Sequence, residues 1–435
     1  MRDTSSTTLE ATIVDLTYDG LGVADLDGKR FFIPGCLPTE RVLLAPRKGR
    51  RKYQQADLVE ILEPAAERVV PPCEYFGRCG GCVLQHLDPL AQLHLKEASV
   101  RAAFLRIGGV EPEEWLAPIQ GPQWNYRRKA RLGVRYVEGK GRVLVGFKER
   151  ATRLLTDMAH CSVLAAPFDK LLGELATLIG TSTIKRRLPQ VEVAVGDSAA
   201  AMVLRTLDPP TEADKNAFCE FGRRRHVDVY IQSGGPGTVR ALEPDQARTL
   251  DYRLEALDLR FEFAPTDFIQ VNAAVNAAMV EQALGLLNVR PSDRALDLYS
   301  GLGNLSLPLA QRANQVTGIE AEAGLVARAV HNAQLNGLEN TRFLSGDLNQ
   351  PEWSFMREHW DLVVLDPPRS GAQVVVEQIG QMNPRGILYI SCHPATLARD
   401  AEKLVTSQGY RMRTAVVADM FPHTHHVEAM AFFER

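Results

Sequence analysis

The chain has 435 residues, of which 45% are hydrophobic and 24% are charged, and its net charge is −3 at pH 7. This length predicts two to four domains with substantial cores, and the composition is that of an ordinary soluble globular protein. The nearly balanced charge excludes a uniformly basic nucleic-acid binder. No apolar run is long enough to cross a bilayer and the N-terminus is polar, so we expect a cytoplasmic protein, without a membrane partner and monomeric.

Positions 9–64 alternate apolar and polar residues in short runs, which are separated by glycine-containing turn dipeptides. About five strands in so short a segment predict a small closed β-barrel of the OB type, whose loops commonly bind nucleic acid. The chain also contains four basic clusters, at 47–52, 127–131, 185–187 and 223–225. We interpret these clusters as local phosphate contacts, because the chain as a whole has no excess of positive charge.

Three of the seven cysteines lie in one glycine-rich loop: Cys73, Cys79 and Cys82. An odd number of cysteines at scattered spacings argues against a disulfide framework. Three thiolates in a loop, with Cys161 as the candidate for a fourth ligand, are typical of a zinc site or an iron–sulfur cluster, and the spacing does not distinguish the two. Cys36 and Cys219 are predicted to be small core residues.

The middle and C-terminal parts of the chain show two different patterns. A helical pattern covers 89–107 and ends at two glycines. Residues 118–265 contain several strand-like runs and one clear helix near 165–179, which predicts an α+β domain. From position 268 onward strands and helices alternate, which predicts a parallel sheet with crossover helices.

The stretch 294–310 is a candidate ligand-binding turn. An apolar strand ends at Asp297, a turn containing Gly301 and Gly303 follows, and a helical pattern comes next. Such a turn lets a ligand approach backbone N–H groups, and the acid Glu320 at the end of the next strand suits ribose hydroxyls. The third glycine of the dinucleotide fingerprint is missing, which favours S-adenosylmethionine over a dinucleotide.

Two further strand ends carry side chains that could take part in a reaction. Asp366 follows the apolar run 362–365 and precedes two prolines, so its carboxylate is predicted to project into the ligand crevice of the sheet. Cys392 follows the strand 386–390 and precedes a helix. The helix N-terminus is predicted to lower the pKa of this thiol and to make the thiolate a good carbon nucleophile.

The C-terminal segment 421–428 brings a carboxylate, Glu428, together with three histidines. This composition allows a metal site. The alternative is that Glu428 is a general base held by a hydrogen-bonded shell.

Together these motifs resemble the RNA uracil-C5 methyltransferases that use S-adenosylmethionine, and within them the iron–sulfur branch that modifies bacterial 23S ribosomal RNA. The resemblance spans nearly the whole chain. It is carried by the cysteine motif and by the segments 268–272 (FIQVN), 297–304 (DLYSGLGN), 366–369 (DPPR), 391–400 (SCHPATLARD) and 423–428 (HTHHVE).

The resemblance implies Cys392 as the nucleophile that adds to C6 of uracil and Glu428 as the acceptor of the C5 proton. It implies six contacts to S-adenosylmethionine: Gln270, Tyr299, Asn304, Glu320, Asp347 and Asp366. It also implies a 4Fe–4S cluster held by Cys73, Cys79, Cys82 and Cys161. The chain departs from the family pattern at Ser300, where Cys is frequent, and at His393, where Asn is common.

The resemblance further implies three domains and 23S ribosomal RNA as the partner. The expected domains are a TRAM barrel over 1–65, a central α+β domain with the cluster loop over 66–84 and 118–265, and a Rossmann-like α/β methyltransferase domain over 85–117 and 266–435. Two rival hypotheses are a tRNA uracil methyltransferase, which generally lacks the barrel and the cysteine motif, and a non-catalytic iron–sulfur RNA-binding protein. The presence of both Cys392 and Glu428 argues against the second rival.

Overall fold

The computed structural model describes residues 8–47, 53–350 and 353–435. Residues 48–52, which make up most of the first basic cluster, lie outside the described residues. The chain divides into two compact units, each described by itself below. The first unit contains Met1–Ser99, Lys148–Thr156 and Phe421–His425, and the second contains Val100–Phe147, Asp157–Met420 and His426–Arg435.

The first unit begins with a six-stranded sheet in the order β1-β5-β6-β4-β3-β2. Its strands are β1 Leu9–Thr12, β2 Asp15–Leu16, β3 Leu21–Leu26, β4 Lys29–Pro34, β5 Arg41–Pro46 and β6 Tyr53–Glu63. The sheet curls on itself, since β1 also contacts β3 and the Val14 N–H donates to the Val23 carbonyl. Phe31, Ile33 and Cys36 lie in the core that it encloses. Cys36 is therefore a core residue, as predicted, and burial raises the pKa of its thiol to about 12.

The helix predicted at 89–107 is present as α1, Pro89–Ala103, which continues into the π-helix η1, Phe104–Gly108. The change to π-helical hydrogen bonding ends at Gly109, which adopts a left-handed conformation with φ 59°. A residue with a side chain is disfavoured in that conformation, so the predicted glycine stop has a physical basis.

The second unit contains a mixed six-stranded sheet in the order β13-β12-β11-β10-β8-β9. Its strands are β8 Lys129–Val137, β9 Arg142–Gly146, β10 Gln190–Val195, β11 Ala200–Arg205, β12 Asp228–Gln232 and β13 Val239–Ala241, and its helices are α2 Leu172–Thr181 and α3 Glu212–Arg225. The helix α3 was not expected from the sequence. Its signal is a capping box, in which the Thr211 side chain accepts from the Asp214 N–H and the Asp214 side chain accepts from the Thr211 N–H.

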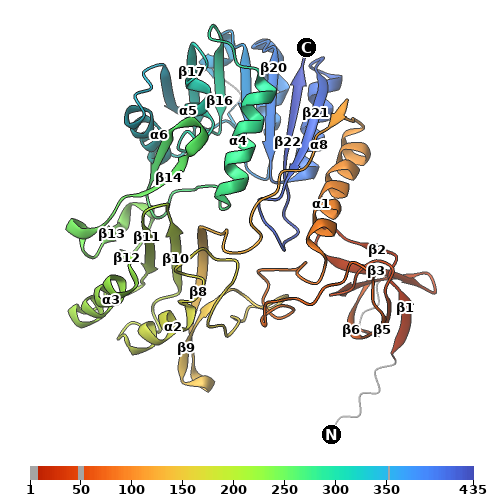
Figure 1. Cartoon of the computed structure of the whole chain (residues 1–435), viewed down its shortest axis with the longest axis vertical. Coiled ribbons are helices and arrows are strands. Elements are labelled where there is room, and N and C mark those ends of the chain that lie inside the picture. Colours follow the sequence, from red (N-terminus) through yellow and green to blue (C-terminus); the bar gives the residue numbers. More distant parts are fainter. Residues whose placement is uncertain (1–7, 48–52, 351–352) are drawn as a thin grey trace. The chain divides into compact units, whose positions relative to one another are not determined.

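The larger sheet of the second unit has eight strands in the order β18-β17-β16-β19-β20-β22-β21-β7. The central strands run side by side in Figure 1, and those from β18 to β20 are parallel. The strands are β7 Glu114–Trp115, β16 Arg294–Leu298, β17 Gln315–Glu320, β18 Thr341–Ser345, β19 Leu362–Leu365, β20 Gly386–Ser391, β21 Arg411–Ala418 and β22 Glu428–Glu434. The predicted parallel sheet is thus confirmed, with an antiparallel β22 added beside β20.

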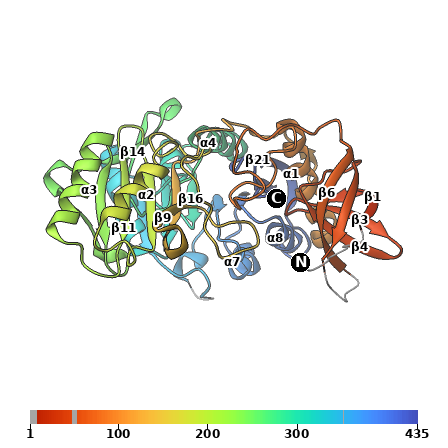
Figure 2. The ribbon, with the colours of Figure 1, turned by 90° about the horizontal axis from the view of Figure 1, so that it is seen from below.

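Helices connect these strands: α4 Ala273–Leu287, α5 Ser306–Ala310, α6 Ala323–Leu335, α7 Gln373–Gln378 and α8 Pro394–Thr406. Figure 2 shows α7 and α8 next to each other, and the two helices are in contact. A separate hairpin, β14 Leu250–Leu254 with β15 Leu259–Phe263, precedes the sheet in the chain. The order of the strands reverses between β16 and β19, and such a switch point opens a crevice at the carboxyl ends of the strands.

The boundaries of the three expected domains stay a prediction. Two structural facts bear on them. The cysteine loop belongs to the same compact unit as the N-terminal sheet, and β7 pairs with β21 of the large sheet. No helix in the described parts of the chain is long and apolar enough to cross a membrane.

Candidate active site

The glycine-rich turn lies at the carboxyl end of β16, at the switch point of the large sheet. Tyr299 has a left-handed conformation with φ 66°, and its N–H and that of Ser300 donate to the Ile319 carbonyl of β17. Gly301 also has a positive φ, and a Cβ atom added there would meet no other atom within 4 Å. Its N–H donates to Glu320 Oε2 at 3.1 Å. The turn therefore exposes backbone beside an acid at the end of β17, as the sequence predicts.

Two more of the predicted cofactor contacts lie at neighbouring strand ends. Asp347 is exposed just after β18, where its carboxylate accepts hydrogen bonds from the backbone and side chain of Asn349. Asp366 is half-buried directly after β19, and its N–H donates to the Leu298 carbonyl of β16. Acids at the ends of three strands, Glu320, Asp347 and Asp366, suit a ligand with ribose hydroxyls and a positive charge.

Gln270 and Asn304 occupy different surroundings. Gln270 is half-buried in the loop between β15 and α4. The side-chain amide of Asn304 exchanges hydrogen bonds with Asn276 (2.9 and 3.0 Å) and accepts one from the Tyr252 hydroxyl (2.8 Å). Because the Asn304 amide is engaged within the fold, its side chain orients the turn, and any contact to a ligand falls more naturally to its backbone.

The predicted nucleophile and base lie on neighbouring strands. Ser391 of β20 pairs with Ala429 of β22, so the next residues along this antiparallel register are Cys392 and Glu428. Glu428 is 4% exposed and Cys392 is half-buried. The two side chains are near enough for the charge of Glu428 to affect the pKa of the Cys392 thiol.

The prediction that the helix lowers the pKa of Cys392 is wrong as a net effect. Burial raises the pKa of this thiol above its ordinary value, and the negative charges of Glu428 and Asp366 raise it further. Arg369 opposes this rise, through its charge and a hydrogen bond to the sulfur. A partly buried thiol among carboxylates favours its neutral form, so the thiolate depends on the guanidinium.

Sequence reasoning assigned no role to Arg369, although it stands in the quoted motif at 366–369. In the structure its guanidinium contacts His426 Nδ1 at 3.1 Å, in addition to the Cys392 sulfur. Its charge also lowers the pKa of Glu428. A cation shared by the thiol and the carboxylate can stabilise the charged form of either.

Burial shifts the pKa of three carboxyl groups of the site, of which Asp297 and Glu428 are buried and Asp366 is half-buried. Burial raises the pKa of Glu428 well above its ordinary value, and the charge of Asp366 adds to the rise. Burial likewise raises the pKa of Asp366 to about 7, with a contribution from Asp297. Burial also raises the pKa of Asp297 to about 7, against a hydrogen bond from the Ser306 hydroxyl. Such acids retain protons near neutral pH and can accept or release them there.

His393, the departure from the family pattern, caps the helix that follows the nucleophile. Its Nδ1 accepts the Thr396 N–H at 3.4 Å, at the start of α8. The imidazole of His393 therefore caps the N-terminus of α8, directly after Cys392.

The alternative of a metal site in 421–428 is not supported. Among the described residues, no group of three or more His, Cys, Asp or Glu side chains is arranged to hold a metal ion. That statement also covers the predicted cluster ligands. Cys73, Cys79 and Cys82 lie in one loop of the first unit, whereas Cys161 belongs to the second unit. Within the loop, the Gly81 N–H donates to Cys79 Sγ at 3.4 Å, and the described cysteines form no disulfide.

Several cations of the predicted phosphate contacts are paired within the protein. The ion pairs are Arg128–Asp197, Arg186–Glu138, Arg187–Asp208, Arg223–Glu243 and Arg225–Glu174. These pairs neutralise much of the charge on which the prediction rested.

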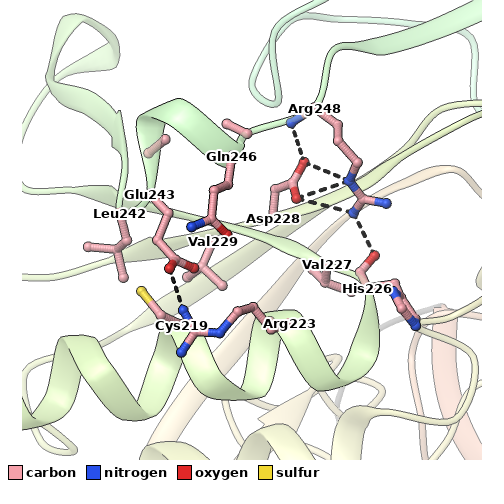
Figure 3. A pocket seen from close by; sticks show the side chains of 13 residues that line it. Cys219, Arg223, His226, Val227, Asp228, Val229, Leu242, Glu243, Gln246 and Arg248 are labelled. Atoms are coloured by element: carbon pink, nitrogen blue, oxygen red, sulfur yellow. Dashed lines mark hydrogen bonds and ion pairs between the residues drawn. The ribbon is translucent and has the colours of Figure 1, made fainter.

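A pocket of about 250 Å³ lies elsewhere, between α3 and the segment 241–248. Figure 3 shows two ion pairs in it, Arg223 with Glu243 and Arg248 with Asp228. Cys219 lines this pocket with 8% of its surface exposed, which fits its predicted place in the core. The charged groups of these two pairs already satisfy one another.

Comparisons with known proteins identify the family of the chain. The family model described as tRNA (Uracil-5-)-methyltransferase matches residues 90–435. The 23S rRNA (uracil(1939)-C(5))-methyltransferase RlmD of Nitrosococcus oceani is 48% identical over 98% of this chain and 96% of its own length. The protein of the same name from Alkalilimnicola ehrlichii is 47% identical, with the same coverage of both chains.

A solved structure shares the fold. It is the Pyrococcus abyssi tRNA (uracil-54, C5)-methyltransferase in complex with S-adenosyl-L-homocysteine, with a TM-score of 0.75 and 23% identity. The similarity covers 98% of this chain and 100% of that one. With a family model matched along its last 346 residues and close relatives aligned over nearly its whole length, this chain belongs to the tRNA (uracil-5-)-methyltransferase family.

Proposed function

We propose that this protein methylates C5 of a uridine in 23S ribosomal RNA in the cytoplasm, with S-adenosylmethionine as the methyl donor. The observation that carries the proposal is the pairing of β20 with β22, which puts Cys392 and Glu428 side by side. The relatives of 47 and 48% identity bear the name of a 23S rRNA enzyme, which supports the choice of RNA.

The roles of Cys392 and Glu428 follow from the chemistry of uracil. C5 of uracil is too weak a nucleophile to take a methyl group unaided. Addition of the Cys392 thiolate to C6 makes an enolate and concentrates electron density at C5. After C5 has been methylated, Glu428 removes the C5 proton, the C5–C6 double bond re-forms, and the thiolate leaves. The target base must leave its stack to expose this edge, so we propose that the uridine is flipped into the crevice.

The chain offers a suitable place for S-adenosylmethionine at the switch point. Gln270, Tyr299, Asn304, Glu320, Asp347 and Asp366 are the proposed contacts. The open space at Gly301 and the acid beside it fit an adenosyl ligand with ribose hydroxyls. When bound, S-adenosylmethionine supplies an electrophilic methyl group. The carboxylates of the site would favour the positive charge of the donor.

We also propose that Cys73, Cys79, Cys82 and Cys161 hold a 4Fe–4S cluster. Four cysteine thiolates fit such a cluster, and the N–H of Gly81 at Cys79 Sγ is the kind of hydrogen bond that tunes cluster sulfurs. The proposed role of the cluster is structural, in shaping the surface that meets RNA. The curled N-terminal sheet is proposed to act as a TRAM barrel that holds the RNA backbone, with affinity falling as salt rises.

A direct assay of substrate choice tests the proposed function. Purified protein is given labelled S-adenosylmethionine with either a 23S rRNA fragment or bulk tRNA, and the modified nucleotide is identified by digestion and mass spectrometry. We expect 5-methyluridine in the rRNA and background label in the tRNA. Methylation of tRNA alone would support the second candidate, a tRNA uracil methyltransferase, whose name is carried by the matched family model.

A further inference from the structure

We propose that Asp400 is a positioning residue, which holds the loop after Asp366 so that Arg369 faces the Cys392 thiol. The inference rests on the proposed role of Cys392 as the nucleophile. It concerns a buried carboxylate that takes no part in the proposed chemistry.

Asp400 is a fully buried acid in the middle of α8, with 0% of its surface exposed. Its Oδ2 accepts the Tyr389 hydroxyl at 2.6 Å and the Ala372 N–H at 2.8 Å. Its Oδ1 accepts the Arg399 Nε–H at 2.8 Å, and Arg399 Nη2 lies 2.7 Å away. A buried charge is costly unless it is paired and hydrogen-bonded, and this one has both kinds of partner.

These partners come from three segments that meet around the nucleophile. Tyr389 lies in β20, three residues before Cys392, and Asp400 lies in the helix that begins just after it. Ala372 belongs to the loop that carries Arg369. The carboxylate therefore ties the strand before the nucleophile, the helix after it and the loop of the guanidinium into one arrangement.

The loop itself is fastened to α8 at two further points. Arg399 Nη2 donates to the Ser370 carbonyl at 3.0 Å, and the Thr396 hydroxyl donates to the Arg369 carbonyl at 3.2 Å. Gly371 adopts φ 81°, and a Cβ atom there would lie 2.6 Å from Asp400 Oδ2. Gly371 therefore packs closely against the Asp400 carboxylate, and a residue with a side chain does not fit at this position.

The position of this loop affects the pKa of the Cys392 thiol. Arg369 opposes the rise in the pKa of Cys392 by its charge and by a hydrogen bond to the sulfur. Both effects fall steeply with distance and angle. Loosening the loop at Asp400 should therefore weaken both effects, although the partners of the Asp400 carboxylate are Tyr389, Ala372 and Arg399.

The test measures the reactivity of Cys392 against pH in the full-length enzyme without RNA. The protein is treated with iodoacetamide, and the alkylated peptide containing Cys392 is quantified by mass spectrometry. We expect Asp400→Asn to move the midpoint of this profile upward by about one pH unit, the lower end of what a nearby charge contributes. Arg369→Gln should move it in the same direction, and the double variant should move it no further than Arg369→Gln alone.

Matched variants keep the result interpretable. Glu402→Gln removes a carboxylate from the same helix and should leave the midpoint unchanged. Tyr389→Phe preserves the packing of the ring but removes one hydrogen bond to Asp400, and we expect a smaller shift of the midpoint with the same sign. This variant carries the test if Asp400→Asn does not fold.

The proposal is overturned if both Asp400→Asn and Tyr389→Phe keep the wild-type midpoint, or if the shifts of Asp400→Asn and Arg369→Gln add in the double variant. Failure of the proposed function is distinguishable from this outcome. Wild-type enzyme that forms no covalent adduct with 5-fluorouridine RNA would remove Cys392 from its role, while the alkylation profile would still report on the loop.

Discussion

At Cys392, burial and neighbouring carboxylates oppose the formation of a thiolate, and the guanidinium of Arg369 favours it. The reactive form is therefore created by an immediate neighbour, and the N-terminus of α8 does not overcome the burial. The same guanidinium acts on Glu428, so the proposed nucleophile and the proposed base share one source of positive charge. The predictions for single residues follow from this arrangement.

Replacement of the nucleophile should stop the reaction at its first step. Cys392→Ala is expected to lower methylation by at least about 10³-fold and to abolish the covalent adduct with 5-fluorouridine RNA, since no other group can add to C6. Cofactor binding, measured by calorimetry, should persist. Cys219→Ala, which changes a core cysteine away from the site, is the control, and normal turnover by Cys392→Ala would refute the assignment.

Replacement of the base should stop the reaction one step later. Glu428→Gln keeps the shape of the side chain but removes its ability to accept the C5 proton, so a methylated RNA covalently bound to the protein should accumulate. Denaturing gels with labelled RNA detect this species. Glu434→Gln, near the far end of β22, is the matched control. Product released by Glu428→Gln at the wild-type rate would assign the proton to another group.

The buried acids predict the direction of a pH effect on stability. The pKa of Asp366 rises to about 7 in the folded state, whereas an unfolded Asp has a pKa near 4. The unfolded state therefore loses its proton first, and the free energy of unfolding falls as pH rises from about 4 to about 7. Asp366→Asn should raise this free energy on the order of 1 to 3 kcal/mol at pH 8 and by less at pH 5. Chemical denaturation at the two pH values measures the difference, and an equal effect at both would contradict the prediction.

At the scale of elements, the turn between β16 and α5 depends on backbone conformations that glycine alone adopts readily. Gly303 has φ 95°, and a Cβ atom there would lie 2.5 Å from the Leu307 side chain. A residue with a side chain would be strained at this φ, and the Leu307 side chain would also have to move. The conformation of the glycine-rich turn is thus coupled to the packing of the first residues of α5.

Gly303→Ala should therefore destabilise the protein by about 1–3 kcal/mol and weaken the binding of S-adenosylmethionine. Gly285→Ala is the matched control, because Gly285 lies in α4 and an added Cβ would meet nothing within 4 Å. That change should be neutral or stabilise the protein by up to about 1 kcal/mol. Thermal melting and calorimetry check both variants, and equal behaviour of the two would show that the turn tolerates a side chain.

At the scale of the whole molecule, the cysteine motif makes a prediction about metal content. Protein purified without oxygen should be brown and contain about four irons per chain, because four thiolates are the usual ligands of a 4Fe–4S cluster. Cys79→Ser should lose the iron, while Cys36→Ala, in the core of the N-terminal sheet, should keep it. Stoichiometric zinc in the wild-type protein would overturn the assignment.

The elements were largely predictable because strands and helices follow from short-range periodicity. The strands β17 and β19 each show as an apolar run closed by an acid, Glu320 as the last residue of β17 and Asp366 directly after β19. The helix α3 was missed, although Thr211 and Asp214 form a capping box at its start. The run of arginines at its end looked like a phosphate contact, and their partners, Glu174 and Glu243, could not be read from spacing.

The sequence by itself predicted the parallel sheet with its crossover helices and the glycine-rich turn at the end of β16, and it proposed Cys392 and Glu428 as nucleophile and base. These depend on residue types at fixed local spacings and on the resemblance of the motifs. Only the tertiary structure decided the protonation of the site. The protonation of Cys392 depends on the charges that surround it. The pairing of β20 with β22 brings Glu428 near it, and the loop after β19 brings Arg369. Local patterns determine local geometry, whereas pKa values depend on burial and on charges that folding alone brings together.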